Sequence, residues 1–173
     1  MKINTIFAEK IYALQLPEFR ENEFRRVLDF WNDVEYLKKF YDVNKNIILQ
    51  NPYLEIKNVH DFIEQVFDES ENLEEEIEHH YENNSLGDLF EYLFHEISPQ
   101  NQFYKKIKQK LLRLYGIKLE DEYLVTGGAI KITKKMQDHP DTTEQLEILK
   151  QTKIFLDSEN ITDLDSLLDF MND

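Results

Sequence analysis

Residues 111–133 constrain the fold more than any other part of this chain. Two apolar, β-favouring runs, LLRLYGIKL and YLVTGGAIKIT, flank the acidic tripeptide EDE at 120–122. Runs of this kind joined by a short polar turn are typical of a β-hairpin. A hairpin that closes at this turn pairs Arg113 near residue 129. Arg113 and Lys131 then share one region of the sheet.

Two of the four glycines in the chain, Gly127 and Gly128, lie in the middle of the second run. Glycine within a strand marks a bulge, a bend or close approach by another backbone. We therefore expect a kink that re-aims the lysines that follow. The chain has neither GxxxxGK[ST] nor GxGxxG, which argues against a phosphate-binding loop of those types. The alternative interpretation is a bent strand in a curved sheet, with no site attached to it.

Helical patterns surround this hairpin, and an extended run precedes them. The N-terminal run is Ile- and Phe-rich, whereas the helical segments carry apolar residues at three-four spacing. We expect a strand at 3–16, helices at 22–42, 58–82, 142–157 and 162–171, and short helices from Ser85 and from Ser98, with 43–57 ambiguous. Together these elements predict one α+β domain over 1–173. It would contain a small antiparallel sheet, made of the N-terminal strand and the C-terminal hairpin, covered by several helices. An acidic helical insertion is expected at about 58–97.

Charge is distributed unevenly along the chain. The formal net charge is −15, which by itself argues against a nucleic-acid partner. Residues 61–96, however, hold thirteen acidic and no basic side chains, whereas residues 103–137 hold nine basic and three acidic ones. One segment therefore repels phosphate and the other attracts it.

Composition excludes several classes of site. The chain has no cysteine, so it has no disulfide, thiolate metal site or cysteine nucleophile. The adjacent His79 and His80 would point about 100° apart on a helix and match no HExxH pattern, so we expect no metal and no cofactor. The chain has no long apolar run, and its N-terminus is a poor signal peptide, so we expect a cytoplasmic protein with no membrane partner.

Basic and tyrosine side chains gather around the hairpin in sequence. They are Lys105, Lys106, Lys108, Lys110, Arg113, Lys118, Lys131, Lys134 and Lys135, with Tyr104, Tyr115 and Tyr123. Such a surface can hold phosphates with its cations while its aromatic rings stack on bases. A solvated lysine-rich face with no ligand is the alternative.

The C-terminal third resembles the end of the RelE/ParE-like toxin superfamily, and among its members the HigB-like, phage-associated ones. The likeness covers about 55 residues. The matching segments are Arg113-Leu114-Tyr115, the turn Glu120-Asp121-Glu122, the stretch Lys131-Ile132-Thr133-Lys134-Lys135-Met136-Gln137 and the helix from Thr143. In that family these positions form a basic strand, an acidic turn, a K-x-T-x-K stretch and a final helix.

The resemblance implies a toxin of a type II toxin–antitoxin pair that cleaves mRNA on the ribosome. In that family a 2′-hydroxyl attacks its own phosphate, and cations stabilise the charge that builds up on the phosphoryl oxygens. The implied phosphate-stabilising residues are Arg113, Lys131 and Lys134, and Tyr104 or Tyr115 would stack or handle a proton. The further RNA-binding residues expected are Tyr104, Lys105, Lys108, Lys110 and Lys135. The implied partners are an antitoxin protein, RNA or the ribosome, and a second copy of the chain in a homodimer.

Two other functions stay open at the sequence level. The chain could be a non-catalytic binding protein of phage or mobile-element origin, whose acidic helical surface at 61–96 engages a basic partner. Alternatively, it could be a toxin fold that has lost catalysis and retained protein binding. Whether the chain is an enzyme therefore depends on which surface does the binding.

Overall fold

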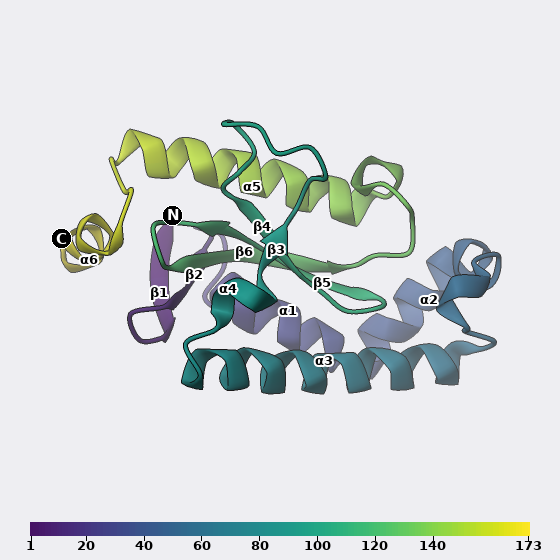
Figure 1. Cartoon of the computed structure of the whole chain (residues 1–173). Coiled ribbons are helices and arrows are strands. Elements are labelled where there is room, and N and C mark those ends of the chain that lie inside the picture. Colours follow the sequence, from purple (N-terminus) through teal and green to yellow (C-terminus); the bar gives the residue numbers. More distant parts are fainter.

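Six strands form one mixed sheet in the order β1-β2-β6-β5-β4-β3 (Figure 1). The structure, a computed structural model, describes residues 1–173. The strands are β1 (Lys2–Phe7), β2 (Ile11–Gln15), β3 (Glu91–Tyr92), β4 (Tyr104–Lys108), β5 (Leu112–Lys118) and β6 (Tyr123–Ile130). All neighbours are antiparallel except β2 and β6, which run parallel. The sheet is therefore mixed, and the predicted all-antiparallel pairing is wrong at this one junction.

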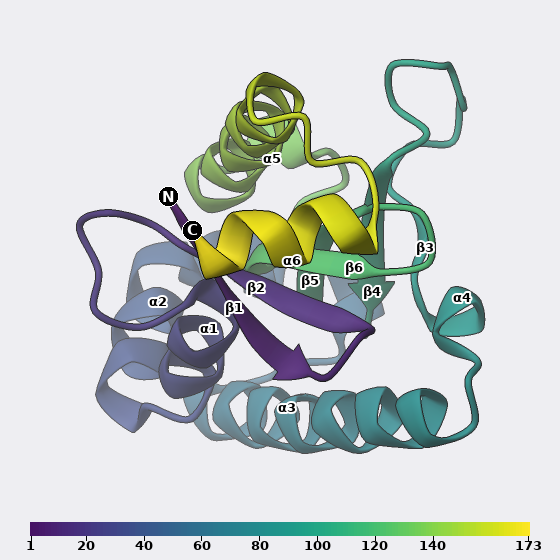
Figure 2. The same ribbon diagram turned by 90° about the vertical axis from the view of Figure 1, so that its left-hand side faces the viewer.

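Helices cover both faces of the sheet, which confirms the predicted α+β fold of a sheet covered by helices (Figure 1). On one face lie α1 (Glu23–Trp31), α2 (Val34–Leu49) and α3 (Val59–Glu82), and on the other lies α5 (Pro140–Ser158). The short α4 (Leu86–Leu89) follows α3, and α6 (Leu164–Asn172) packs beside β1 (Figure 2). None of these helices combines the length and the apolar character that crossing a bilayer requires.

The three-four spacing of apolar residues explains which side each helix buries. Leu37 of α2 and Phe62 and Leu73 of α3 belong to the larger core, between the sheet and α1–α3. Leu149 and Leu156 of α5 belong to a second core on the opposite face. Every one of these side chains is almost fully buried, and removing such apolar surface from water is the main force that holds helices against a sheet.

The predicted hairpin is confirmed in position and register. Arg113 pairs with Ala129, as expected from closure at 120–122. Tyr115 pairs with Gly127 but Gly116 pairs with Val125, so Thr126 is the extra residue of a β-bulge. Gly127 has a φ of +155°, a backbone conformation that side chains rarely adopt. The kink expected at the glycine pair is therefore present.

The predicted N-terminal strand at 3–16 is in fact a hairpin. Its turn lies at Ala8–Lys10, where Lys10 N donates to Phe7 O and Glu9 takes a left-handed conformation with φ 64°. Glutamate rarely adopts this conformation, so no local signal marks the turn.

The helix predicted at 22–42 is two helices. Asp33 interrupts it and accepts hydrogen bonds from the backbone N–H groups of Glu35 and Tyr36, which makes it the N-cap of α2. The second helix then continues to Leu49, through part of the region that the sequence left ambiguous.

The short helix predicted from Ser98 is also wrong, because residues 104–108 form β4. Phe103, Ile107 and Leu111 are spaced four apart, which suits a helix. The segment instead pairs with β5 from Tyr104–Ile117 to Lys108–Arg113. This pairing satisfies the open edge of β5, and such non-local backbone bonding overrides a short local pattern.

Candidate functional site

Five of the predicted site residues line a single pocket, which we call the basic pocket. They are Arg113, Tyr115, Lys131, Lys134 and Lys135. The pocket has a volume of about 220 Å³, and its other lining residues are Leu93, Phe94, His95, Lys106, Met136 and Gln137. No aspartate or glutamate lines it. On a chain of net charge −15, this is a local concentration of positive charge.

Strand pairing explains how these side chains meet. Lys106 of β4 lies directly opposite Tyr115 of β5, and directly opposed residues of an antiparallel pair point to the same face. Tyr115 belongs to the core on the α5 side, so this row faces α5. Arg113 lies two residues before Tyr115 and shares that face. Lys131 follows β6 and is fixed beside β5 because its backbone N–H donates to Leu111 O at 2.7 Å.

Main-chain carbonyls, and not carboxylates, hold the Arg113 guanidinium. Its Nη1 donates to Leu112 O at 3.0 Å and also to Gln109 O, both at the turn between β4 and β5. No carboxylate lies within ion-pair distance of it. Burial lowers the pKa of Arg113 from its ordinary value, but a guanidinium still stays charged at neutral pH. Arg113 thus supplies a permanent positive charge with no carboxylate in contact, and the charges of Glu69 and Glu91 act on it from further away.

Main-chain carbonyls also position Lys131, and its ammonium group loses a proton more readily than that of an ordinary lysine. Its Nζ donates to Thr133 O and Lys134 O, each at 2.7 Å. Burial lowers the pKa of Lys131, and the positive charges of Arg113, Lys106 and Lys108 lower it further. A neutral lysine amine has two N–H groups and one lone pair. When Lys131 loses its proton, its two remaining N–H groups can keep both carbonyl bonds and leave the lone pair free to accept a proton.

Tyr115 contributes a buried hydroxyl that has no partner. The side chain is 1% exposed, and its Oη makes no hydrogen bond. Burial raises the pKa of Tyr115, so the hydroxyl stays protonated and can act as a donor. The predicted stacking role for Tyr115 is wrong, because a ring this deeply buried cannot receive a base. An unpaired buried hydroxyl is costly, and a ligand oxygen in the pocket would satisfy it.

One carboxylate forms an ion pair with a residue of this cluster, and two others, Glu69 and Asp138, lie near enough to act on Arg113 and Lys131. Glu91 of β3 is 3.7 Å from the Lys106 Nζ and is itself exposed. Lys134 and Lys135 are exposed on the segment after β6 and have no carboxylate partner. The cations thus outnumber the carboxylates around the pocket, and a phosphate or another oxyanion would balance them.

The other predicted RNA-binding residues do not line the basic pocket. Lys110 pairs with Glu55 at 2.9 Å. Lys105 is buried, with its Nζ 3.4 Å from the centre of the Tyr92 ring. Tyr104 packs edge-on against Phe94. Lys108 is exposed at the end of β4, where its charge still acts on Lys131.

Lys106 and His95 line the basic pocket although neither is among the residues predicted for the site. The pattern around Lys106 predicts a helix, whereas in β4 its side chain shares one face of the strand with Lys108. His95 lies in a loop after β3, and its place beside residues forty positions later has no local signal. Pairing of β4 with β5 brings Lys106 to the hairpin, and pairing of β3 with β4 brings the segment that precedes His95 alongside.

Comparison with models of protein families, with curated proteins and with solved structures found no match to this chain.

Proposed function

We propose that this chain is an RNA-cleaving toxin that binds RNA phosphates in the basic pocket and is held in check by an antitoxin protein. One observation carries the proposal. Arg113, Lys131, Lys134 and the unpaired hydroxyl of Tyr115 line one pocket that contains no carboxylate. Fixed cations and donors around developing negative charge are the main means by which proteins stabilise phosphoryl transfer.

The chemistry of the pocket assigns a role to each group. The RNA 2′-oxygen attacks the adjacent phosphorus, the bond from phosphorus to the 5′-oxygen breaks, and a cyclic phosphate and a 5′-hydroxyl result. Lys131 takes the 2′-hydroxyl proton on its free lone pair, and its lowered pKa favours the neutral form that this requires. Arg113 and the Tyr115 hydroxyl bind the phosphoryl oxygens. His95 also lines the pocket, and we assign to it the return of a proton to the leaving 5′-oxygen.

Purified protein tested on labelled single-stranded RNA, with and without ribosomes, checks this function. We expect cleavage of the RNA and none of an oligonucleotide that lacks the 2′-hydroxyl at the cut position. Lys131→Arg keeps the charge but removes the neutral amine, so it should retain binding and lower the cleavage rate by about 100-fold. Lys131→Met should lose both. Replacing both Lys38 and Lys39, two exposed lysines on α2, with alanine is the matched control and should change neither.

Expression in bacteria gives an independent readout. Wild type should arrest growth and Lys131→Met should not, whereas the α2 lysine control should arrest growth as wild type does. Absence of both RNA binding and cleavage, with and without ribosomes, would overturn the proposal. So would growth arrest that persists unchanged in Lys131→Met.

A second candidate function is protein binding by the outer face of α3. Glu71, Glu74, Glu75 and Glu78 are exposed there, and none has a cation within ion-pair distance. This face suits a basic partner, which the non-catalytic alternative requires. Reversing three of these charges should then abolish the biological effect, whereas replacing Lys131 should leave it unchanged.

A further inference from the structure

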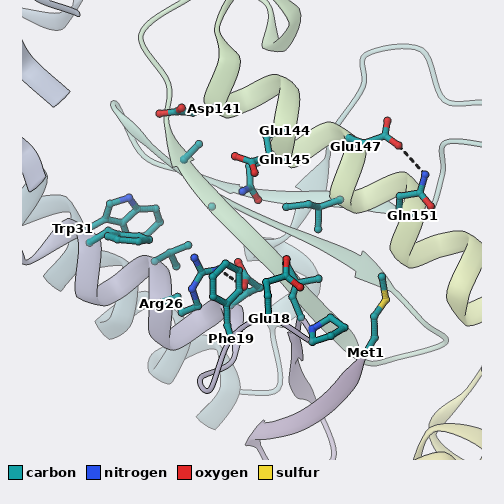
Figure 3. A pocket seen from close by; sticks show the side chains of 18 of the residues that line it. Met1, Glu18, Phe19, Arg26, Trp31, Asp141, Glu144, Gln145, Glu147 and Gln151 are labelled. Carbon is teal, nitrogen blue, oxygen red and sulfur yellow. Dashed lines mark hydrogen bonds and ion pairs between the residues drawn. The ribbon is translucent and has the colours of Figure 1, made fainter. Parts of the chain in front are cut away.

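A cavity of about 670 Å³ lies where β2 and β6 separate, away from the basic pocket (Figure 3). The two strands pair in parallel only over Ile11–Ala13 and Tyr123–Val125. Beyond that point the chain after β2 leads to α1 on one face of the sheet, whereas β6 leads to α5 on the other face (Figure 1). Divergence of neighbouring parallel strands to opposite faces opens a crevice at their carboxyl ends, which is a common place for ligands.

The glycine pair of β6 lies against this crevice. A Cβ on Gly127 would lie 2.1 Å from the Gln145 Oε1, and a Cβ on Gly128 would lie 2.9 Å from two ring atoms of Trp31. Gln145 of α5 and Trp31 of α1 therefore pack directly on bare backbone. The absence of side chains at these two positions lets residues from both helices approach the strand.

The cavity is acidic and aromatic. Five carboxylates line it, those of Glu18, Glu23, Asp141, Glu144 and Glu147, against the single guanidinium of Arg26. Glu18, Asp141 and Glu144 have no ion-pair partner. The rings of Phe19, Phe30, Trp31 and Tyr36 also line it. Aromatic faces combined with carboxylates form the usual environment for an organic cation.

Arg26 shows that this environment already holds a cation. Its guanidinium carbon lies 3.2 Å from the centre of the Phe19 ring, and its Nη1 pairs with the buried Glu23. Burial raises the pKa of Tyr36 to about 12, and the charges of Asp141 and Glu144 add to the shift. The carboxylates of Asp141 and Glu144 therefore act on Tyr36 although Arg26 lines the same cavity.

Gln145 lines the cavity and also packs on Gly127 of the glycine pair. Gln145 is 8% exposed, and its Oε1 is buried with no hydrogen-bond partner. Figure 3 shows Glu144 and Gln145 on α5, across the cavity from Arg26 and Phe19. The Oε1 lies against the Gly127 backbone, so a ligand N–H group reaches this acceptor when the amide turns towards the cavity, and it would then satisfy the acceptor.

We propose that this crevice binds a guanidinium or alkylammonium group carried on an apolar stem, with its N–H groups donating to Gln145 and to the carboxylates of α5. The stem lies against the aromatic rings, and the charge is balanced by Glu18, Asp141 and Glu144. This inference does not depend on the proposed RNA chemistry, because the two pockets differ in charge sign and share no lining residue.

Titration calorimetry at low ionic strength tests the inference with two probes, spermidine and a Gly-Arg-Gly peptide blocked at both ends. We expect saturable one-site binding of at least one probe. The same peptide with citrulline, which is uncharged, should not bind. Binding of spermidine alone identifies free polyamines as the source of the cation, and binding of the peptide alone identifies a polypeptide side chain. If neither probe binds, or the citrulline peptide binds as well as the arginine peptide, the inference is wrong.

Matched variants separate a built site from general attraction to an acidic protein. Glu18→Gln with Glu144→Gln should weaken binding by about tenfold, because both carboxylates are exposed at the cavity and make no internal hydrogen bond. Glu74→Gln with Glu75→Gln removes the same charge from α3 and should leave the affinity unchanged. Equal weakening by the two pairs would show non-specific attraction and overturn the inference.

Gln145→Met gives a signature that a purely structural role would not produce. The substitution removes an unpaired buried acceptor, so the variant should be at least as stable as wild type in urea. It should nevertheless bind the cation about tenfold more weakly. A loss of stability without a loss of binding would mean that the Gln145 oxygen serves the fold alone, and the inference would fail.

Discussion

Two residues of the pockets have buried polar groups that make no hydrogen bond, which lowers the stability of the folded state. The Tyr115 hydroxyl and the Gln145 carbonyl are both buried without partners, one beside cations and the other beside carboxylates. Few such groups occur in native interiors, because each forgoes the hydrogen bonds that it made to water. A third such atom, Asn4 Oδ1, lies in neither pocket, so we infer a polar ligand from the pockets as well as from the unpaired groups.

Gly127 provides the first test at this scale. Its φ of +155° disfavours any side chain, and a Cβ there would overlap the Gln145 Oε1. Gly127→Ala should therefore lower the free energy of unfolding by about 2–4 kcal/mol, from backbone strain and from displacement of Gln145. Urea denaturation measures the loss. Gly87→Ala is the control and should be near neutral, because its nearest neighbour is 3.7 Å away and its backbone is ordinary. Similar losses in both variants would contradict a special role for the bulge.

Glu23 provides a second test through pH. Burial raises the pKa of Glu23 above its value in the unfolded chain, and hydrogen bonding and pairing with Arg26 offset only part of the shift. The folded state therefore holds this proton more tightly than the unfolded state. The stabilising contribution is fully present below the unfolded pKa and is lost as pH rises through the folded pKa.

The Glu23→Gln variant lacks this titration. Relative to the variant, wild type should lose stability as pH rises from 4 towards neutrality, which urea denaturation at a series of pH values measures. A difference that grows in favour of wild type over that range would mean that the pair with Arg26 outweighs the burial of Glu23.

At the scale of elements, the turn between β4 and β5 is clamped from both faces of the sheet. From α3, the buried Glu69 accepts hydrogen bonds from Leu111 N at 2.7 Å and Leu112 N at 3.3 Å. From the other side, Arg113 donates to two carbonyls of the same turn. A carboxylate and a guanidinium thus satisfy backbone groups of opposite polarity in one loop. The clamp fixes the strand that carries the basic pocket to the long acidic helix.

Glu69→Ala should break this clamp. It leaves two buried amides without an acceptor, so the free energy of unfolding should fall by about 2–4 kcal/mol. Glu69→Gln keeps a carbonyl oxygen and should lose about half as much. Glu71→Ala, on the exposed side of the same helix, should stay within about 0.5 kcal/mol of wild type. If Glu69→Ala costs no more than Glu71→Ala, the clamp carries little of the stability.

The elements that the sequence predicts correctly are those that depend on residues close together in the chain. The β5–β6 hairpin, its register and the kink at Gly127 were predictable, because turn chemistry and alternation lie within twenty residues. The same local register brought Arg113 and Lys131 into one region. The long helix α3 was predictable for a similar reason: Asn58 caps it, accepting from Asp61 N at 2.9 Å.

What could not be predicted depends on partners distant in the chain. Strand β4 exists because β5 offers it an open edge, so Lys106 reached the site by a pairing that its own segment does not encode. The parallel contact of β2 with β6 joins the N-terminal hairpin to the β5–β6 hairpin, more than a hundred residues later in the chain. The crevice between α1 and α5 follows from that contact. Neither the crevice nor its buried acceptor has any signal in a short window of sequence.

At the scale of the whole molecule, the sheet separates the basic pocket from the acidic helix α3. The acidic helix α3 lies on the face opposite α5 (Figure 2). The basic pocket lies on the α5 face. The segregation seen along the sequence is therefore a segregation in space. At physiological salt the screening length is about 8 Å, so the pocket is largely shielded from the charges on the far face. At low salt the net charge of −15 should slow the approach of any polyanion.

Reversing charge on α3 tests this separation and decides between the two candidate functions. A variant with Glu74→Lys, Glu75→Lys and Glu78→Lys changes the net charge by six units without touching the basic pocket. The association rate for single-stranded RNA should rise about tenfold at low salt and converge on wild type near 0.5 M salt, while dissociation stays the same, because only long-range steering has changed. Stopped-flow anisotropy measures both rates. If the variant binds and cleaves RNA normally yet no longer acts in cells, the outer face of α3 is the working surface, and the basic pocket serves another purpose.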